Sequence, residues 1–294
     1  MTAAPATRVD AHQHFWRYAA ADYPWMDAHM SALRRDWLPQ DLRPLLDAQG
    51  IDLCIAVQAR ADEAENAFLL EQATAHPWIA GVVGWVDLLA DDAHDRLAYW
   101  SQSPRFKGVR HLLQDDPDVA ATLADTRFGR GIDAVQAQGL VYEVLVRGLA
   151  QLSLVPAFCA RHEGHWLVLD HLGKPAIGGA GEAEWRRHLR TLAAQPHVAC
   201  KLSGLVTEVV GPQLDADALH RHLDAALDAF GAGRLMFGSD WPVCLLAADY
   251  AEVVMAAEQT LETAGLDAAE RDLVFGANAR RVYRLPEPTD DHGG

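Results

Sequence analysis

Short runs of apolar and often β-branched residues alternate with longer segments of helical periodicity along the whole chain. Eight of the short runs have the length and composition of β-strands. The predicted strands are Arg8–Ala11, Ile51–Gln58, Ile79–Val86, Phe106–Leu112, Leu140–Val146, Trp166–Asp170, Val198–Leu202 and Arg234–Gly238. The predicted helices between them include Gln40–Gln49, Glu63–Ala75, Asp92–Ser101, Phe128–Gln138, Glu182–Ala194 and Asp217–Phe230.

Strands that read as continuous apolar runs are typical of a parallel sheet covered by helices on both faces. Eight strand–helix units in 294 residues match a single (β/α)8 barrel, an α/β fold of about 250 residues. An open doubly wound sheet is the alternative, but AHQHFW follows the first strand where that fold would have a glycine-rich phosphate turn. We therefore predict one barrel domain over residues 1–285 and a flexible C-terminal tail over residues 286–294.

Two segments are predicted to lack regular structure. The stretch from Phe15 to Pro39 is long, irregular and rich in tryptophan. A loop of that length inside a compact domain is usually functional, so we expect a lid over the site. The glycine-rich patch Gly178–Gly181 is expected to be a loop and not a domain boundary.

The charge balance excludes several classes of partner. Lys and Arg total 25 against 41 Asp and Glu, a formal charge of −16 that repels nucleic-acid phosphates and anionic lipids. The sequence has no apolar run of signal-peptide or membrane-helix length, so we expect a cytoplasmic protein whose partner is a small molecule. A homo-oligomeric state is left open. Four cysteines without a CxxC pair are expected to be buried free thiols.

Two histidines end the first predicted strand. His12 and His14 are two residues apart, and because side chains alternate along a strand both rings point to the same side. In a barrel that side can be the mouth, where active sites gather. Two imidazoles on one face form half of a metal site. By itself the pattern is weak, since a chance pair is the alternative in a chain with 14 histidines.

Three further residues strengthen this interpretation. His171 and Asp240 follow the sixth and eighth predicted strands, and Glu143 lies within the apolar fifth strand. Each has a structural alternative: His171 could cap a loop, and Asp240 could cap the next helix. Glu143, which needs a partner or a metal when buried, could pair with Arg147 or Lys201.

Basic residues recur in or after the predicted strands and would make the mouth locally positive. They are Arg60, Lys107, Arg110, Arg147 and Lys201, and salt bridges within an acidic protein are the alternative. The aromatic residues that could form a wall for a sugar ring, or could belong to the core, are Phe15, Trp16, Tyr23, Trp25 and Trp241. We expect the five basic residues, Trp25 and Trp241 to bind substrate.

Motifs along nearly the whole chain resemble the amidohydrolase superfamily, in the branch that hydrolyses lactones. These motifs are VDAHQHFW at 9–16, DYPWM at 22–26, FKGVRHLLQ at 106–114, LDHLGKP at 169–175, CKLSGL at 200–205 and FGSDWPV at 237–243. The resemblance implies a (β/α)8 barrel. It also implies that His12, His14, His171 and Asp240 form the active centre, with Asp240 handling the proton of the attacking water.

The sequence departs from the wider superfamily in its metal ligands. Binuclear members carry a carboxylated lysine in the middle strands, where this chain has Glu143. They also carry histidines on two consecutive later strands, whereas here Lys201 and Ser203 follow His171. The resemblance therefore implies one zinc ion or no essential metal, held by some of His12, His14, Glu143, His171 and Asp240. No organic cofactor is expected.

The expected reaction is opening of a sugar lactone by an activated water. Independently of the resemblance, a lactone is an activated ester, so a carboxylate base with electrophilic donors at the carbonyl could suffice. Asp240 is the expected base, and His14 and His171 are expected to polarise the carbonyl directly or through zinc. The resemblance implies aldono-lactones of the L-fucono or L-rhamnono type. One alternative is hydrolysis of carboxylated or sulfonated lactones from aromatic breakdown, and another is metal-dependent decarboxylation. A non-enzymatic binding protein is the remaining alternative.

Overall fold

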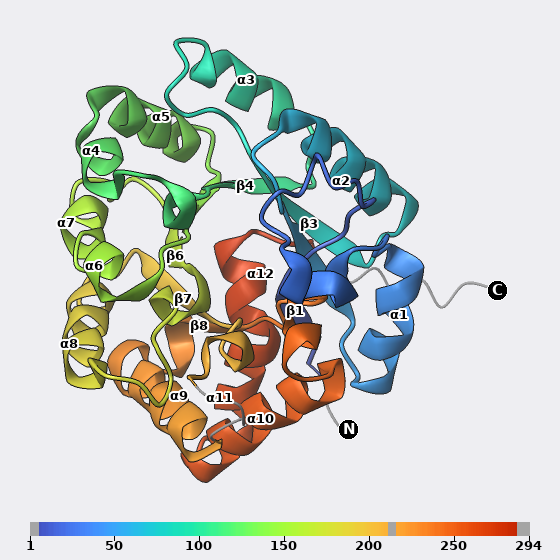
Figure 1. Cartoon of the computed structure of the whole chain (residues 1–294), viewed down its shortest axis with the longest axis vertical. Coiled ribbons are helices and arrows are strands. Elements are labelled where there is room, and N and C mark those ends of the chain that lie inside the picture. The colour runs from blue at the N-terminus through green and yellow to red at the C-terminus, as the bar shows by residue number, and fades with distance from the viewer. Residues whose placement is uncertain (1–5, 211–215, 287–294) are drawn as a thin grey trace.

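The computed structural model describes residues 6–210 and 216–286, and within them eight parallel strands follow one another around a barrel (Figure 1). Each strand pairs with the next one in the chain, from β1 to β8. The strands are β1 (Val9–Gln13), β2 (Leu53–Val57), β3 (Ile79–Gly84), β4 (Phe106–His111), β5 (Val141–Val144), β6 (Leu167–Leu169), β7 (Val198–Leu202) and β8 (Leu235–Phe237). The predicted (β/α)8 barrel is confirmed.

The barrel closes between β1 and β8 at the carboxyl ends of the strands. Gln13 and Trp241 form a parallel bridge there. The backbone N–H of His14 donates to the Trp241 carbonyl at 2.7 Å, and that of Asp240 donates to the His12 carbonyl at 2.8 Å. These bonds join the first and last strands beside residues expected in the active centre.

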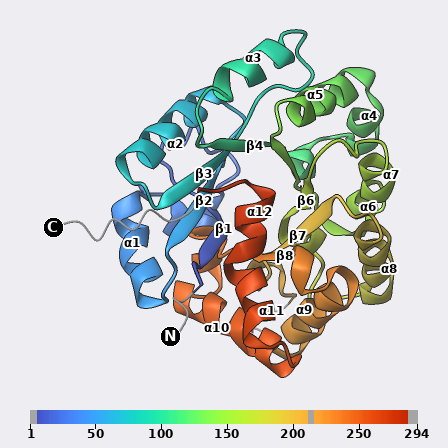
Figure 2. The same ribbon diagram turned by 180° about the vertical axis from the view of Figure 1, so that it is seen from behind.

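Helices surround the strands as an outer ring (Figures 1 and 2). Those between β1 and β5 are α1 (Pro39–Ala48), α2 (Glu63–Ala75), α3 (Ala93–Trp100), α4 (Val119–Ala124) and α5 (Thr126–Ala137). Those that follow are α6 (Gly148–Leu152), α7 (Val155–Cys159), α8 (Glu182–Ala193), α9 (Ala216–Phe230), α10 (Tyr250–Thr263), α11 (Ala268–Asp272) and α12 (Asn278–Val282). No helix in the described part of the chain is long and apolar enough to cross a membrane.

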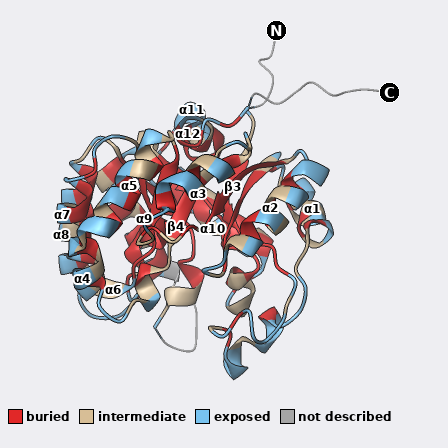
Figure 3. Ribbon diagram, turned by 90° about the horizontal axis from the view of Figure 1, so that it is seen from above, coloured by how far each residue is buried: buried red, intermediate tan, exposed pale blue. Residues whose placement is uncertain are grey.

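Apolar side chains fill two concentric layers, so that burial concentrates in the strands and the inner faces of the helices (Figure 3). The outer layer lies between strands and helices. The inner layer fills the barrel, where Val9, Ile55 and Met236 pack with Val282 and Tyr283 at the C-terminal end of α12. This helix closes the end of the barrel opposite the mouth. All four cysteines are free and buried, as expected.

The predicted lid segment is an ordered loop with a 3-10 helix at Ala28–Leu33. Trp16 is fully buried and its indole N–H donates to the Arg35 carbonyl at 2.9 Å, which ties the start of the loop to its end. The Trp25 indole N–H donates to the Ala59 carbonyl at 3.0 Å, which ties the middle of the loop to the segment after β2. The predicted C-terminal tail lies, apart from Pro286, outside the described residues.

Candidate active site

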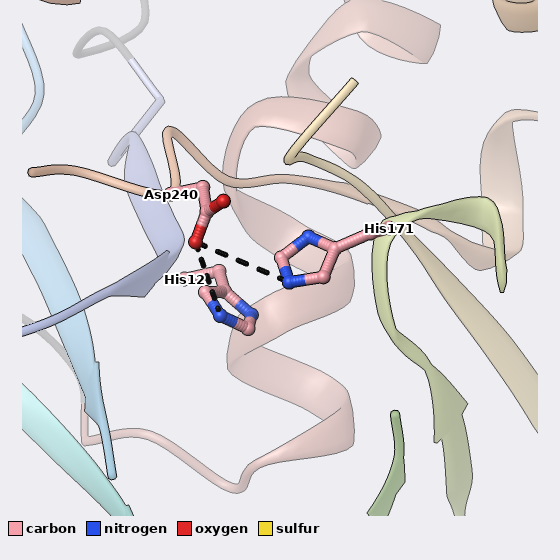
Figure 4. Close-up of side chains that lie close together, drawn as sticks. All are labelled: His12, His171 and Asp240. Atoms are coloured by element: carbon pink, nitrogen blue, oxygen red, sulfur yellow. Dashed lines mark ion pairs between the residues drawn. The ribbon is translucent and has the colours of Figure 1, made fainter. Parts of the chain in front are cut away.

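Three imidazoles converge on one carboxylate oxygen at the mouth of the barrel. The Asp240 Oδ1 atom lies 3.2 Å from His14 Nε2, 3.7 Å from His12 Nε2 and 4.0 Å from His171 Nε2. All four side chains are buried. Figure 4 shows His12, His171 and Asp240 pointing toward one another from three separate strand ends. The four residues expected in the active centre are therefore brought together.

Backbone geometry at the strand ends directs these side chains. Asp240 and His171 both have left-handed backbone conformations, with φ of 58° and 53°. Such conformations are uncommon for non-glycine residues and cluster at functional sites. Asp10, which is buried in β1, fixes both neighbouring segments: its Oδ1 accepts from the backbone N–H of His12 at 3.1 Å and of Ser239 at 2.9 Å. The left-handed turns thus point the functional side chains into one space.

The surroundings set the charge of each group. Burial lowers the pKa of His171 to about 4, against the attraction of Asp240. Burial and the Lys201 ammonium hold the pKa of His12 well below its usual range, so both rings are neutral. Burial opposes ionisation of Asp240, but His171 and the hydrogen bond with His14 outweigh it and keep the pKa of Asp240 below its usual range. Asp240 is therefore a carboxylate, the form that a base requires.

His14 connects the centre to the carboxyl end of β2. Its Nδ1 atom lies 2.8 Å from the carbonyl oxygen of Val57, and since a carbonyl only accepts, the Nδ1 atom carries a proton. Its Nε2 atom faces Asp240 Oδ1 at 3.2 Å. His14 therefore holds Asp240 in place against the end of β2.

The donor set fits zinc. Ligand atoms of His12, His171 and Asp240 all lie within 4.8 Å of one another. Two imidazole nitrogens and one carboxylate oxygen match the three-ligand sets of catalytic zinc sites. The outer nitrogens also face polar groups: His171 Nδ1 is 2.9 Å from Ser203 Oγ, and His12 Nδ1 is 3.1 Å from Lys201 Nζ and 3.5 Å from Asp170 Oδ1.

A second polar cluster lies beneath this centre, inside the barrel. Lys201 Nζ is 2.6 Å from Glu143 Oε1, 3.4 Å from Asp170 Oδ1 and 3.1 Å from His12 Nδ1, and the Tyr283 hydroxyl donates to Glu143 Oε1 at 2.5 Å. Glu143 thus has the lysine partner named as its alternative. Its ligand atoms group with those of His12 and Asp170, separately from the set of His12, His171 and Asp240. Lys201 is fully buried and does not line the cavity, so the expectation that it binds substrate is wrong.

A cavity of about 530 Å³ opens above the centre. Lid and loop residues give it an apolar side, and charged and amide side chains give it a polar side. Its lining is His14, Trp25, Met30, Ala59, Arg110, Leu112, Gln114, Asp115, Leu145, Arg147, His171, Lys174, Val206, Thr207, Glu208, Val209, Asp240, Val243, Leu246 and Ala247. This volume suits a single small-molecule ligand.

Two of the predicted basic residues and one predicted tryptophan line this cavity. Trp25 reaches it from the lid. Arg110 Nη1 is bound by Asp170 Oδ2 at 3.0 Å, and its other terminal nitrogen donates to the Gln58 carbonyl, so much of its hydrogen-bonding capacity is already used. Arg147 is more exposed and lies 3.9 Å from Glu208.

The other substrate-binding predictions are not supported by the positions of the side chains. Lys107 lies near the start of β4, away from the mouth, and its Nζ donates to the Arg284 carbonyl at 2.9 Å. The residues of β4 that reach the mouth are those at its carboxyl end. The expectation that Lys107 faces the cavity is therefore wrong.

Trp241 and Arg60 are also not among the residues that line the cavity. The Trp241 ring is fully buried and packs between those of Phe15 and Trp37, at centroid distances of 6.1 and 5.1 Å. Trp241 is therefore a core residue, the alternative already given for it. Arg60 forms an ion pair with Asp22 at 3.0 Å and so fastens the lid loop.

Lys174 and Glu208 are cavity residues that the sequence analysis missed. Lys174 belongs to the LDHLGKP motif, but only the fold shows that its side chain turns into the same cavity as His171. Burial lowers the pKa of Lys174, against the attraction of Asp240 and Glu208. Glu208 follows the seventh strand in a stretch without strand or helical periodicity, and no sequence signal indicated it.

Fold and site together define the class of protein: a (β/α)8 barrel with three histidines and an aspartate gathered at its mouth, where active sites of this fold lie. The chain belongs to the amidohydrolase family, whose model matches residues 9–285. The family expected from the motifs is confirmed.

Two proteins and one crystal structure show what this chain is similar to. An L-fucono-1,5-lactonase of Burkholderia multivorans is 54% identical, over 97% of this chain and 98% of the relative. An L-fucono-1,5-lactonase of Burkholderia ambifaria is 39% identical over the same shares of the two chains. A crystal structure of an amidohydrolase from Burkholderia multivorans with bound zinc superposes with a TM-score of 0.92 at 54% identity, over 96% of this chain and 100% of the other.

Proposed function

We propose that this amidohydrolase opens the ring of sugar lactones, with L-fucono-type lactones preferred, by means of a water activated at Asp240. The observation that carries the chemistry is the ionised Asp240 carboxylate among three imidazoles at the floor of the cavity. The substrate class rests on the two L-fucono-1,5-lactonase relatives, which match almost the whole chain.

The reaction needs one proton acceptor and donors for a developing charge. Asp240 accepts a proton from water while the water oxygen bonds to the lactone carbonyl carbon. The carbonyl oxygen becomes negative, and a hydrogen-bond donor or cation on the cavity wall stabilises it, a contribution that is typically worth about 3–4 kcal/mol of barrier. The bond between the carbonyl carbon and the ring oxygen then breaks, and the proton held by Asp240 passes to the ring oxygen, which gives the hydroxy acid and restores the Asp240 carboxylate.

We propose one zinc ion as the resident metal, held by His12, His171 and Asp240. Such an ion supplies Lewis-acid polarisation and a more acidic bound water. The residues themselves hold it through neutral imidazoles and an ionised carboxylate. The zinc-containing structure at 54% identity supports this assignment.

The cavity suits a deoxy-sugar lactone. Arg147, Gln114 and Thr207 offer hydrogen-bonding groups for ring hydroxyls, and Trp25 and Met30 offer an apolar surface for a ring face or a methyl group. A lactone carrying several anionic groups would instead require converging cations. Asp170 already binds Arg110, and the other two cations of the cavity, Arg147 and Lys174, share Glu208 as an ionic partner. Because these carboxylates compensate much of the positive charge, that alternative substrate class is disfavoured.

A panel assay tests the proposal. Proton release is followed with a pH indicator as purified protein meets L-fucono-, L-rhamnono- and other aldono-lactones, with and without a chelator. A carboxylated aromatic-derived lactone serves as the competing substrate, and the Asp240→Asn variant as the enzyme blank. Opening of the L-fucono-lactone by wild type alone supports the proposal, whereas activity only on the carboxylated lactone contradicts it.

A further inference from the structure

Four consecutive residues after β6 adopt left-handed backbone conformations. The φ angles are 53° at His171, 53° at Leu172, 72° at Gly173 and 49° at Lys174. Only one of the four is glycine, the residue that takes this conformation at no steric cost. For the other three the left-handed conformation brings Cβ too close to the following carbonyl oxygen and is strained. Such strain persists only where the surroundings enforce it, and it clusters at functional sites.

The surroundings hold this left-handed turn firmly. The Trp185 indole N–H donates to the Leu172 carbonyl at 2.8 Å, and both residues are buried. The backbone N–H of Lys174 donates to the His171 carbonyl at 2.8 Å, and the Lys174 carbonyl accepts from Gly148 at 3.2 Å. The turn is therefore bonded at both ends and in the middle.

The consequence of the turn is that two side chains three residues apart enter the same cavity. His171 and Lys174 both line it, together with Asp240. A left-handed turn here gives the centre a histidine and, beside it, a cation. A strand that continued past Leu169 in extended conformation would place successive side chains on alternating sides.

The Lys174 ammonium retains unused hydrogen-bonding capacity. Its side chain is 12% exposed, and its partner Glu208 Oε1 is 3.8 Å away, beyond hydrogen-bond distance. Across residues 6–210 and 216–286, Lys174 Nζ forms no hydrogen bond with the protein. Arg110, by contrast, is bound by Asp170 and Gln58. Lys174 is thus a largely covered cation on the wall of the cavity, and its ammonium has donors left free.

We propose that Lys174 contacts the substrate: its ammonium donates a hydrogen bond to an oxygen of the bound lactone and stabilises the negative charge gained as the ring opens. The inference rests on the proposed function, which supplies the lactone, and adds a residue to it. The ammonium keeps its protons throughout. Its contribution increases as charge develops, so it acts more on turnover than on ground-state binding.

Two substitutions and a matched control test this role. Lys174→Met keeps the apolar stem and removes the charge, and Lys174→Arg keeps the charge. Lys107→Met is the control, because Lys107 is also a partly buried lysine but lies away from the cavity. We measure kcat and KM with L-fucono-1,5-lactone, the inhibition constant of the product L-fuconate, the dissociation constant of neutral L-fucose, and the thermal midpoint.

For Lys174→Met we expect kcat/KM to fall and the L-fuconate inhibition constant to rise, each by about 10- to 100-fold, the range of a charged hydrogen bond. L-fucose binding should change less than about threefold, since it presents no developing charge. Lys174→Arg should keep a larger share of activity than Lys174→Met, and Lys107→Met should resemble wild type. Equal losses for L-fuconate and L-fucose, or activity within about threefold of wild type, would overturn the assignment.

Lys174→Gly separates function from folding, because it removes the ammonium and the left-handed strain together. We expect a thermal midpoint no lower than that of Lys174→Met and an equally low kcat/KM. If Lys174 served the structure alone, Lys174→Gly would have a lower thermal midpoint than Lys174→Met. If the wild-type protein opens no lactone, the proposed function is wrong. If the wild type is active and Lys174→Met has the same kcat/KM, only the role of Lys174 is wrong.

Discussion

Glu65 makes the stability of this protein depend on pH in a window that the structure defines. The side chain is 1% exposed at the start of α2. Its Oε2 accepts from the backbone N–H groups of Ala59 at 2.9 Å and Arg60 at 3.1 Å, and its Oε1 accepts from the Tyr23 hydroxyl at 3.4 Å. Glu65 therefore joins the lid to the segment after β2.

The expected magnitude follows from the pKa of this carboxyl. Burial raises the pKa of Glu65 from 4.5 to about 7, although the hydrogen bonds from Arg60 and Ala59 oppose the shift. At about 1.4 kcal/mol for each pH unit, this difference corresponds to about 3 kcal/mol. The folded protein keeps the Glu65 proton between pH 4.5 and 7, whereas the unfolded chain loses it. The contribution is therefore fully present below pH 4.5 and is lost as the pH rises to 7.

Glu65→Gln should remove this dependence. The amide oxygen of glutamine can accept the two backbone bonds, and its N–H can donate to Tyr23. We expect the free energy of unfolding of Glu65→Gln, relative to wild type, to rise by about 3 kcal/mol between pH 4.5 and 7.5. Urea unfolding followed by circular dichroism at half-unit pH steps measures the difference. Glu71→Gln, on the exposed face of the same helix, is the control and should run parallel to wild type.

A pH-independent difference between Glu65→Gln and wild type, constant within about 0.5 kcal/mol, would refute this reasoning. A difference that changed in the opposite direction would do the same, because it would require Glu65 to be stabilised as a carboxylate. The same change in Glu71→Gln would assign the pH dependence to the general loss of a negative charge.

The remaining predictions concern the centre and the cluster beneath it. Asp240→Asn should lower kcat on the best lactone by at least about 100-fold with an unchanged thermal midpoint, and retention of a tenth of the activity would contradict its role as base. His171→Asn should lower kcat as well, while His220→Asn on α9 should not. Elemental analysis should find no more than one zinc per chain, and two equivalents required for turnover would be incompatible with this centre. Lys201→Met should cost about 3–5 kcal/mol of unfolding free energy, because Glu143 would be left buried without its ammonium, and urea unfolding with a smaller loss would show that the pair is dispensable.

Elements of regular periodicity could be predicted from the sequence because burial requires their pattern. The strand Val198–Leu202 and the helix Glu63–Ala75 have the predicted bounds, and the other predicted strands differ by a few residues at their ends. Strand ends are harder to predict because hydrogen bonds to neighbouring strands set them. The short helices α4, α6, α7, α11 and α12 were not predicted, since five or six residues are too few to establish a period. The longer helix α10 was not predicted either, although it has 14 residues.

The candidate site also contains residues that could be predicted from the sequence and residues that could not. His12, His14, His171 and Asp240 could be found because each ends a predicted strand, and the barrel brings strand ends to one mouth. Lys107 and Lys201 were misplaced because a sequence does not show how deep in the barrel a strand residue lies. Lys174 was missed because its direction depends on a left-handed turn that a run of Leu, Gly and Lys does not specify.

The bridge between β1 and β8 also determines when the centre can come into existence. Asp240 lies 226 residues after His14, and the backbone bonds that close the barrel flank both of them. A chain that still lacks the strand that closes the fold also lacks Asp240, the proton acceptor of the proposed mechanism. Closure of the barrel therefore brings His14 and Asp240 together, and a chain that ends before Asp240 cannot open a lactone by that mechanism.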